Sequence, residues 1–134
     1  MDLAPPPPAV VIQMDPGGRI DSRMQEIARL RANGTRVVID GYCASACTMY
    51  LMLSGQICAT KRAVLAFHAP YRCRTGGAPC PEDLKVFDPA VTYAQLRSSP
   101  APVQRWILAR GGLTAQNLTM PNRDVLRFVP LCGA

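Results

Sequence analysis

Apolar residues fall into short runs along the chain, separated by glycine, proline and polar residues, and the spacing in each run predicts an element. Val10 to Met14 is a short apolar run that indicates a strand, and Asp15-Pro16-Gly17-Gly18 predicts a sharp turn after it. From Ile20 to Ala32, apolar residues recur at helical spacing, and Asn33-Gly34 is a typical helix end. The first third of the chain therefore begins as strand, turn and helix.

The next runs repeat this order. Val37 to Ile39 is a short apolar run, as in a buried parallel strand, and Asp40-Gly41 predicts its end. Small residues follow, then a strongly apolar run that predicts a helix ending at Ser54-Gly55. Ile57 to Ala59 and Val64 to Phe67 indicate two more strands. Alternating strands and helices predict right-handed crossovers and an α/β fold with a mostly parallel sheet.

The remainder is less regular. Pro70 to Pro102 is rich in proline, glycine and serine, with at most a short helix near Tyr93 to Leu96. Val103 to Arg110 predicts a helix, and Val125 to Val129 predicts a final strand.

Composition narrows the class of protein. With 134 residues, the chain predicts one domain over residues 10–134, after a flexible proline-rich lead-in over residues 1–9. Its net charge is +6, but the arginines are scattered and no basic run is interleaved with aromatic residues, so nucleic-acid binding is not expected. No stretch approaches the roughly 20 apolar residues of a membrane span.

Six cysteines indicate an oxidising, extracytoplasmic compartment. Cys73 and Cys80 lie in a Gly/Pro-rich loop and predict a small disulfide loop, and the cysteine spacings match no common zinc site. No signal peptide is visible, and Met1-Asp2-Leu3 before a run of prolines is typical of a start codon placed on a trimmed chain. The alternative is a cytosolic protein with buried free thiols. The other four cysteines, whose pairing stays open, are Cys43, Cys47, Cys58 and Cys132.

Two residues suited to acyl-transfer chemistry fall at predicted strand ends. Ser45 lies at the expected start of the second helix, where unpaired backbone N–H groups favour negative charge. His68, the only histidine, follows 23 positions later (68 − 45). Serine is a weak nucleophile until a base takes its proton, and histidine can accept and return a proton near neutral pH. A helix-capping serine and an ordinary surface histidine are the alternative interpretation.

Three segments, VVIQMDPGGRI, GYCASACTMYLML and RAVLAFHAP, together resemble the catalytic subunit of Clp protease within the wider Clp/crotonase superfamily. The resemblance is greatest to the small Clp-like periplasmic proteins of bacteria. It covers Val10 to Pro70, about 61 of the 134 residues, in the family's order and near its spacing. It implies an α/β fold of the Clp/crotonase type, a ββα superhelix, truncated at the N-terminus, and a periplasmic location.

The resemblance also implies a serine hydrolase of the peptidase type, acting on a peptide or protein substrate without a cofactor or a metal ion. Ser45 would be the nucleophile and His68 the general base. The backbone N–H groups of Gly17, Gly18 and Ala46 would form the oxyanion hole.

The third catalytic residue of the family, an aspartate, has no direct match. The comparable segment is LTMPNRDVLRF, in which Asp124 is the candidate and Asn122 the alternative, and a backbone or water partner for the histidine is a further one. The helical handle that stacks Clp rings is replaced by the loop between Cys73 and Cys80, so a homo-oligomer stays open and a partner unfoldase is not implied.

Other functions fit parts of this pattern. A catalytically degenerate Clp-fold binding or assembly module would explain the missing aspartate. A crotonase-like enzyme would use the oxyanion hole on a coenzyme A thioester, although no adenine or phosphate site is evident. Cys43 and Cys47 flank Ser45, so a thiol nucleophile is a minor alternative, with a buried or disulfide-bonded role as the other interpretation.

Overall fold

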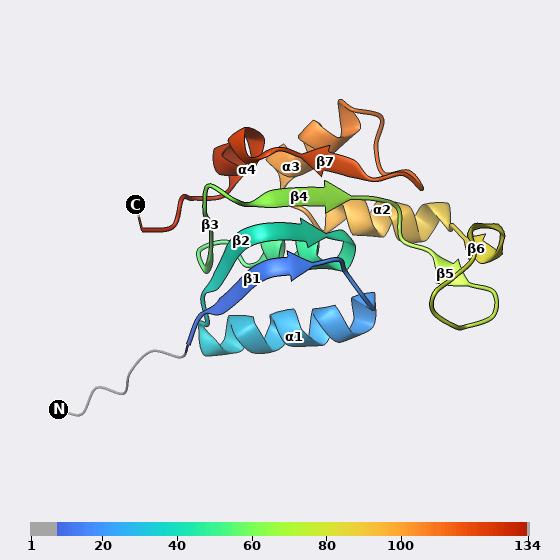
Figure 1. Cartoon of the computed structure of the whole chain (residues 1–134), viewed down its shortest axis with the longest axis horizontal. Coiled ribbons are helices and arrows are strands. Elements are labelled where there is room, and N and C mark those ends of the chain that lie inside the picture. The colour runs from blue at the N-terminus through green and yellow to red at the C-terminus, as the bar shows by residue number, and fades with distance from the viewer. Residues whose placement is uncertain (1–7, 134) are drawn as a thin grey trace. The chain divides into compact units, whose positions relative to one another are not determined.

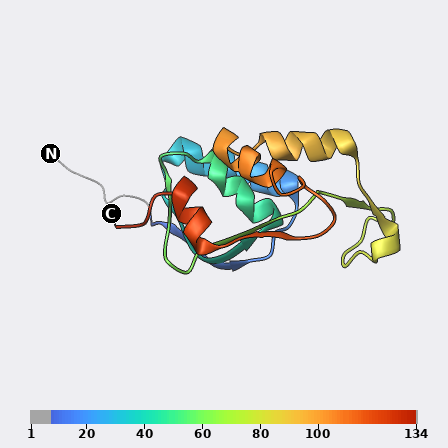
Figure 2. The same cartoon turned by 90° about the horizontal axis from the view of Figure 1, so that it is seen from above.

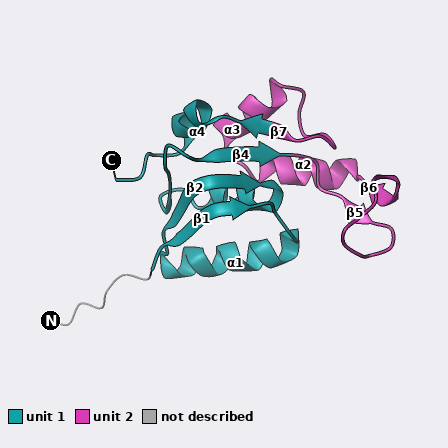
Figure 3. Cartoon of the chain, in the orientation of Figure 1, with its two compact units in different colours: residues 1–67, 119–134 teal, residues 68–118 magenta. Residues whose placement is uncertain are grey.

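The computed structural model describes residues 8–133, which form two compact units (Figure 3). Of the described residues, the first unit contains 8–67 and 119–133, and the second contains 68–118. Of the lead-in predicted over residues 1–9, residues 1–7 lie outside the described part of the chain. A single domain over residues 10–134 stays a prediction.

A mostly parallel sheet forms the centre of the first unit (Figure 1). The strand order is β1-β2-β4-β7, and β3 pairs with β2 off this path. β2 is parallel to β1, β3 and β4, which confirms the predicted α/β class with a mostly parallel sheet. The strands are β1 (Val10–Asp15), β2 (Val37–Ala44), β3 (Ile57–Ala59), β4 (Val64–Phe67) and β7 (Leu118–Met120).

β2 is longer than the sequence predicted. Asp40-Gly41 was expected to end the strand, but the strand continues to Ala44 and its register with β1 shifts between Ile12 and Met14. A Cβ at Gly41 would collide with the backbone carbonyl of Gln13. The glycine therefore permits a close approach of the two strands at a β-bulge, rather than a turn.

Two helices cover one face of this sheet, α1 (Ile20–Asn33) and the 3₁₀ helix η1 (Ser45–Met52) (Figure 2). α1 buries Ile27 and Leu30 against the unit and ends where Gly34 takes a left-handed conformation (φ +65°). η1 is almost wholly buried, as its continuous apolar run predicts, but it forms a 3₁₀ helix.

The segment predicted as a final strand, Val125 to Val129, lies instead largely in helix α4 (Asn122–Phe128). Val125 and Val129 are both buried, and their four-residue separation suits one face of a helix as well as a strand. Asp124 lies in the first turn and Arg127 in the last, where their charges favour the helix dipole. The positions of these two charges indicate a helix, whereas the apolar pattern alone does not distinguish a helix from a strand.

The second unit contains a two-stranded antiparallel hairpin and two helices. The predicted short helix near Tyr93 is longer than expected, because Asp88 accepts a hydrogen bond from the Ala90 N–H (2.9 Å) and Pro89 takes the first helical position. The elements are β5 (Arg72–Cys73), η2 (Glu82–Leu84), β6 (Lys85–Val86), α2 (Pro89–Arg97) and α3 (Ala101–Leu108).

All six cysteines are paired, as Cys43–Cys47, Cys58–Cys132 and Cys73–Cys80. The predicted Cys73–Cys80 loop is confirmed, and three disulfides are typical of a protein from an oxidising, extracytoplasmic environment. Leu131 pairs in parallel with Ala59, so the Cys58–Cys132 bridge joins the C-terminal segment to β3. Within residues 8–133, no helix has the length and apolar character to cross a membrane.

We predict that the longest disulfide loop contributes most to stability. Cys58 and Cys132 are 74 positions apart, so their bridge removes about 4.5 kcal/mol of unfolded-chain entropy in the loop-closure relation. Cys73 and Cys80 are 7 positions apart, which gives about 2.5 kcal/mol. Urea unfolding of the two double-alanine variants measures the difference, and an equal loss of stability in both would contradict it.

Candidate active site

Ser45 lies where the chain turns from β2 into η1, at the carboxyl edge of the parallel sheet. Its backbone takes φ +57°, and it is the one non-glycine residue among residues 8–133 recorded in the left-handed region. Ala44, not Ser45, is the N-cap of η1, and no side chain caps this helix. The alternative of a simple capping serine therefore does not hold, because the residue occupies a strained turn that needs another cause.

Gly17 packs directly against this serine. A Cβ added at Gly17 would lie 2.7 Å from the Cβ and 3.1 Å from the Oγ of Ser45. Gly17 also has φ +112°, so both its conformation and its contact with Ser45 require glycine. A Cβ at Gly18, in contrast, would meet no heavy atom of the described chain within 4 Å. The structure thus brings together two of the predicted site residues, Gly17 and Ser45.

The Gly17 N–H group already has a partner. It donates to Oδ1 of Asp15 at 2.9 Å, in the short-range pattern of an Asx turn. Ala46 lies in the first turn of η1, where backbone N–H groups lack a partner within the helix. Of the three predicted oxyanion donors, the Gly17 N–H is therefore already hydrogen-bonded within the turn.

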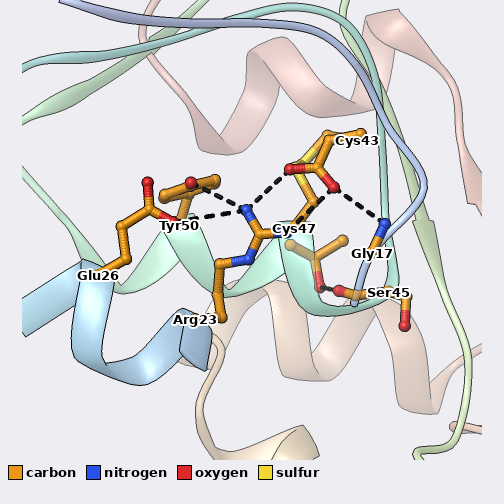
Figure 4. Close-up of polar contacts among 9 residues, drawn as sticks. Gly17, Arg23, Glu26, Cys43, Ser45, Cys47 and Tyr50 are labelled. Atoms are coloured by element: carbon orange, nitrogen blue, oxygen red, sulfur yellow. Dashed lines mark hydrogen bonds and ion pairs between the residues drawn. A yellow bond between two sulfur atoms is a disulfide. The ribbon is translucent and has the colours of Figure 1, made fainter. Parts of the chain in front are cut away.

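A charged network centred on Arg23 (Figure 4) fixes Asp15 in this position. The Arg23 guanidinium contacts both Asp15 carboxylate oxygens, at 2.8 and 3.1 Å, and donates to the Tyr50 hydroxyl at 2.9 Å. The side chains of Arg23 and Asp15 are 12% and 18% exposed, so solvent screens this pair only weakly. Burial raises the pKa of Tyr50, against the opposing effect of the Arg23 hydrogen bond. The network joins β1, α1 and η1 beneath the Gly17 turn.

Sequence reasoning treated Asp15 as an ordinary turn residue and missed this network. An ion pair between residues eight positions apart, on a strand end and a helix, leaves no local periodic signature. The Asp-Pro-Gly-Gly turn next to a helix carrying Arg23 was the available signal, and it is not specific.

Cys43 and Cys47, two residues away on either side of Ser45, form a disulfide with each other (Figure 4). Neither sulfur is therefore a thiol. This pairing rules out the minor alternative of a cysteine nucleophile in the oxidised protein and identifies the structural role that the sequence left open.

His68 directly follows Phe67, the last residue of β4, and is the first residue of the second unit. Its Nδ1 lies 2.8 Å from the carbonyl oxygen of Ala69. A carbonyl oxygen only accepts hydrogen bonds, so Nδ1 carries the proton and Nε2 is left as the basic nitrogen. The ring also stacks on Tyr71, with centroids 6.3 Å apart. Both contacts fix the orientation of the imidazole within its own unit.

The strand register relates the two chain segments that lead to Ser45 and His68. Ala44 of β2 pairs with Ala66 of β4 in parallel. The chain leaves β2 into Ser45 and leaves β4 into His68, so both strands direct their chains from the carboxyl edge of the sheet. Ligands of open parallel sheets bind outside this edge.

The two candidates for a third catalytic residue lie on α4. Asn122 donates from Nδ2 to the carbonyl oxygens of Thr60 and Ala63, both at 2.9 Å. These carbonyls precede β4, so the Asn122 amide holds the opposite end of β4 from Phe67. Asp124 lies in the first turn of α4, with a carboxylate oxygen 3.6 Å from Nη1 of Arg127. A catalytic role for Asp124 stays a prediction.

No protein-family model matches the chain, and no curated protein matches it. Solved structures do match in fold. One is a mutant of the 1510-N membrane-bound stomatin-specific protease in complex with a substrate peptide, at 19% sequence identity and a TM-score of 0.59. The match covers 92% of this chain and 59% of that one, so the chain spans about three fifths of the protease's length. At this identity the likeness shows the fold alone, and the fold is Clp-protease-like.

Proposed function

We propose that the protein is a serine hydrolase of the peptidase type, with Ser45 as the nucleophile and His68 as the general base. The observation that carries the proposal is the left-handed backbone of Ser45, held against Gly17 at the carboxyl edge of the parallel sheet. Strained non-glycine residues persist only where the surrounding structure holds them, and they cluster at functional sites. An ordinary surface serine would not need Gly17 against it.

The chemistry follows from the atoms available. In the proposed reaction, Nε2 of His68 takes the hydroxyl proton as Ser45 Oγ attacks the carbonyl carbon of a peptide. The backbone N–H groups of Gly18 and Ala46 would stabilise the developing oxyanion, since the Gly17 N–H is held by Asp15. The imidazolium would then protonate the leaving amine, and water would release the acyl group by the reverse steps.

A peptide suits the second unit better than a coenzyme A thioester does. An open cavity of about 580 Å³ is lined by apolar and aromatic side chains, with Thr92, Tyr93 and Thr114 as its polar members and no basic residue to bind a phosphate. Ala69, which follows His68, is part of the lining. The similar protease was studied with a substrate peptide bound. The three disulfides further support a periplasmic location.

A catalytically degenerate binding module is the second candidate. It is supported by one observation: the Asn122 amide, one of the two candidates for a third catalytic residue, already donates hydrogen bonds to the two carbonyl oxygens that precede β4. Such a module would bind peptides without reacting with an electrophile. Reactivity of Ser45 therefore separates the two functions.

We predict that a fluorophosphonate probe labels the folded protein at Ser45. The Ser45→Ala variant should lose the label completely, because no other hydroxyl is placed in this turn. Ser54→Ala, which removes an exposed serine nine positions away, is the matched control and should be labelled as the unmodified protein is. Mass spectrometry of the labelled peptide measures the site, and an unlabelled but well-folded protein would favour the binding module.

We predict that His68→Asn abolishes labelling of the folded protein, because the amide that replaces the imidazole cannot accept the proton of the Ser45 hydroxyl. Asp124→Asn tests whether Asp124 is the third catalytic residue or whether the Ala69 carbonyl, which accepts from Nδ1, orients the imidazole instead. Removing the orienting aspartate of a Ser-His-Asp triad costs about 10⁴-fold. A loss approaching that size in Asp124→Asn would assign the aspartate as the third member.

We predict that Asp15→Asn lowers both stability and labelling. It removes the nearer of the two carboxylates that contact the Arg23 guanidinium, Asp15 at 2.8 Å and not Glu26 at 4.0 Å, in a site where little solvent reaches, at a cost of about 1–3 kcal/mol. The Gly17 turn should loosen as well. Asp21→Asn breaks a pair with Arg19 in which both side chains are largely exposed, and should change little. Thermal unfolding and labelling rates measure both variants, and equal effects would refute a special role for Asp15.

A further inference from the structure

The Cys43–Cys47 disulfide encloses Ser45 in a ring of five residues (Figure 4). Cys43 is the second-last residue of β2, and Cys47 is the third residue of η1. The bridge therefore spans the point at which extended backbone becomes helical. The Cα atoms of the two cysteines are 5.3 Å apart, within the normal range for a disulfide.

One end of this bridge is fixed in the central strand of the sheet. Cys43 pairs with Asp15 of β1 on one side and with Leu65 of β4 on the other. Both cysteines are fully buried. The disulfide thus links the beginning of η1 to a strand that is paired on both sides. Ser45 lies midway between the two cysteines in the sequence.

Two non-covalent contacts also restrain Ser45. The Thr48 hydroxyl donates to the Ser45 carbonyl oxygen at 2.7 Å, and Gly17 leaves room for the side chain. A Cβ at Gly17 would also lie 3.2 Å from the carbonyl oxygen of Ala44 in β2, but neither contact is a covalent link across the turn. A left-handed conformation is unfavourable for serine, so something must prevent the turn from relaxing to a right-handed one. The Cys43–Cys47 bridge is a covalent cross-link that spans this turn.

We propose that the Cys43–Cys47 disulfide is a positioning element of the active site, which holds Ser45 in the left-handed conformation and keeps its Oγ ready for attack. The inference rests on the proposed function. Small displacements of a reacting group can cost about a hundredfold in rate. The nucleophile would then be fully competent only where this disulfide persists, and its activity would depend on the redox state of the compartment.

Loss of activity by reduction of the Cys43–Cys47 disulfide requires a dithiol reductant. Two electrons and two protons pass from the dithiol to the bridge, the S–S bond breaks to leave two cysteine thiols, and the reductant becomes a disulfide. Because both cysteines are fully buried, attack by a thiolate needs a local opening of the turn. Replacing both cysteines by alanine removes the bridge without requiring this opening.

The test compares two double variants with a fluorophosphonate probe. Cys43→Ala/Cys47→Ala removes the bridge around Ser45, and Cys73→Ala/Cys80→Ala removes a disulfide of similar loop length in the second unit. We expect the first to lower the maximal labelling rate by about 10- to 100-fold with unchanged probe affinity, and the second to leave both unchanged. An undiminished maximal rate in folded Cys43→Ala/Cys47→Ala would overturn the inference, as would an equal loss in both variants.

A spectroscopic measurement separates this inference from the proposed function. NMR couplings and chemical shifts of Ser45 report its φ directly, whether or not the serine is reactive. We expect a left-handed Ser45 in the unmodified protein and a right-handed or averaged one without the bridge. A left-handed Ser45 in both proteins would overturn the positioning role. If Ser45 changes conformation as expected but the unmodified protein is not labelled, only the proposed hydrolase function is overturned. Should the alanine variant not fold, Cys43→Val/Cys47→Ala restores buried volume and takes its place.

Discussion

The close approach of Gly17 to Ser45 is the constraint on which the rest of the site depends. Two parallel strands end side by side, and the loops that follow them can meet only if one contributes no side chain. Glycine at position 17 satisfies this, and the Asp15 carboxylate then holds the Gly17 N–H. Arg23 fixes the carboxylate in turn, so a turn of four residues is supported from the helix that follows it. The site is therefore a property of strand ends and not of a flexible loop.

The first half of the fold could be predicted from the sequence because its apolar periods are clear. The strands at Val10, Ile57 and Val64 and the helix from Ile20 are found close to their predicted bounds. The continuation of β2 past Asp40-Gly41 could not be predicted, since a glycine that breaks a strand and a glycine that permits a bulge look alike in sequence. Only the position of Gln13 on the neighbouring strand distinguishes them.

The site shows the same division. The contact between Ser45 and Gly17 could be expected from the order of short motifs, because a strand end, a glycine turn and a helix start are local features. The pairing of Cys43 with Cys47 and of Asp15 with Arg23 depends on which side chains face each other once the sheet has formed. A four-residue cysteine spacing also fits two neighbours on one buried helix face, so the bridge had no unique signature. Helix α4 was missed because Val125, Phe128 and Val129 carry no period long enough to distinguish helix from strand.

The second unit is a continuous insertion in the first, and this has a consequence for substitutions within it. The chain leaves the sheet after β4 and returns at β7, and these two strands are neighbours in the sheet. Residues 68–118 can thus change in length or sequence without altering the pairing of β1, β2 and β4. Ser45 and its glycine turn belong to the first unit, whereas the apolar cavity is lined wholly by residues of the second. Substitutions that reshape this cavity are therefore expected to leave the paired strands that support Ser45 and Gly17 unchanged.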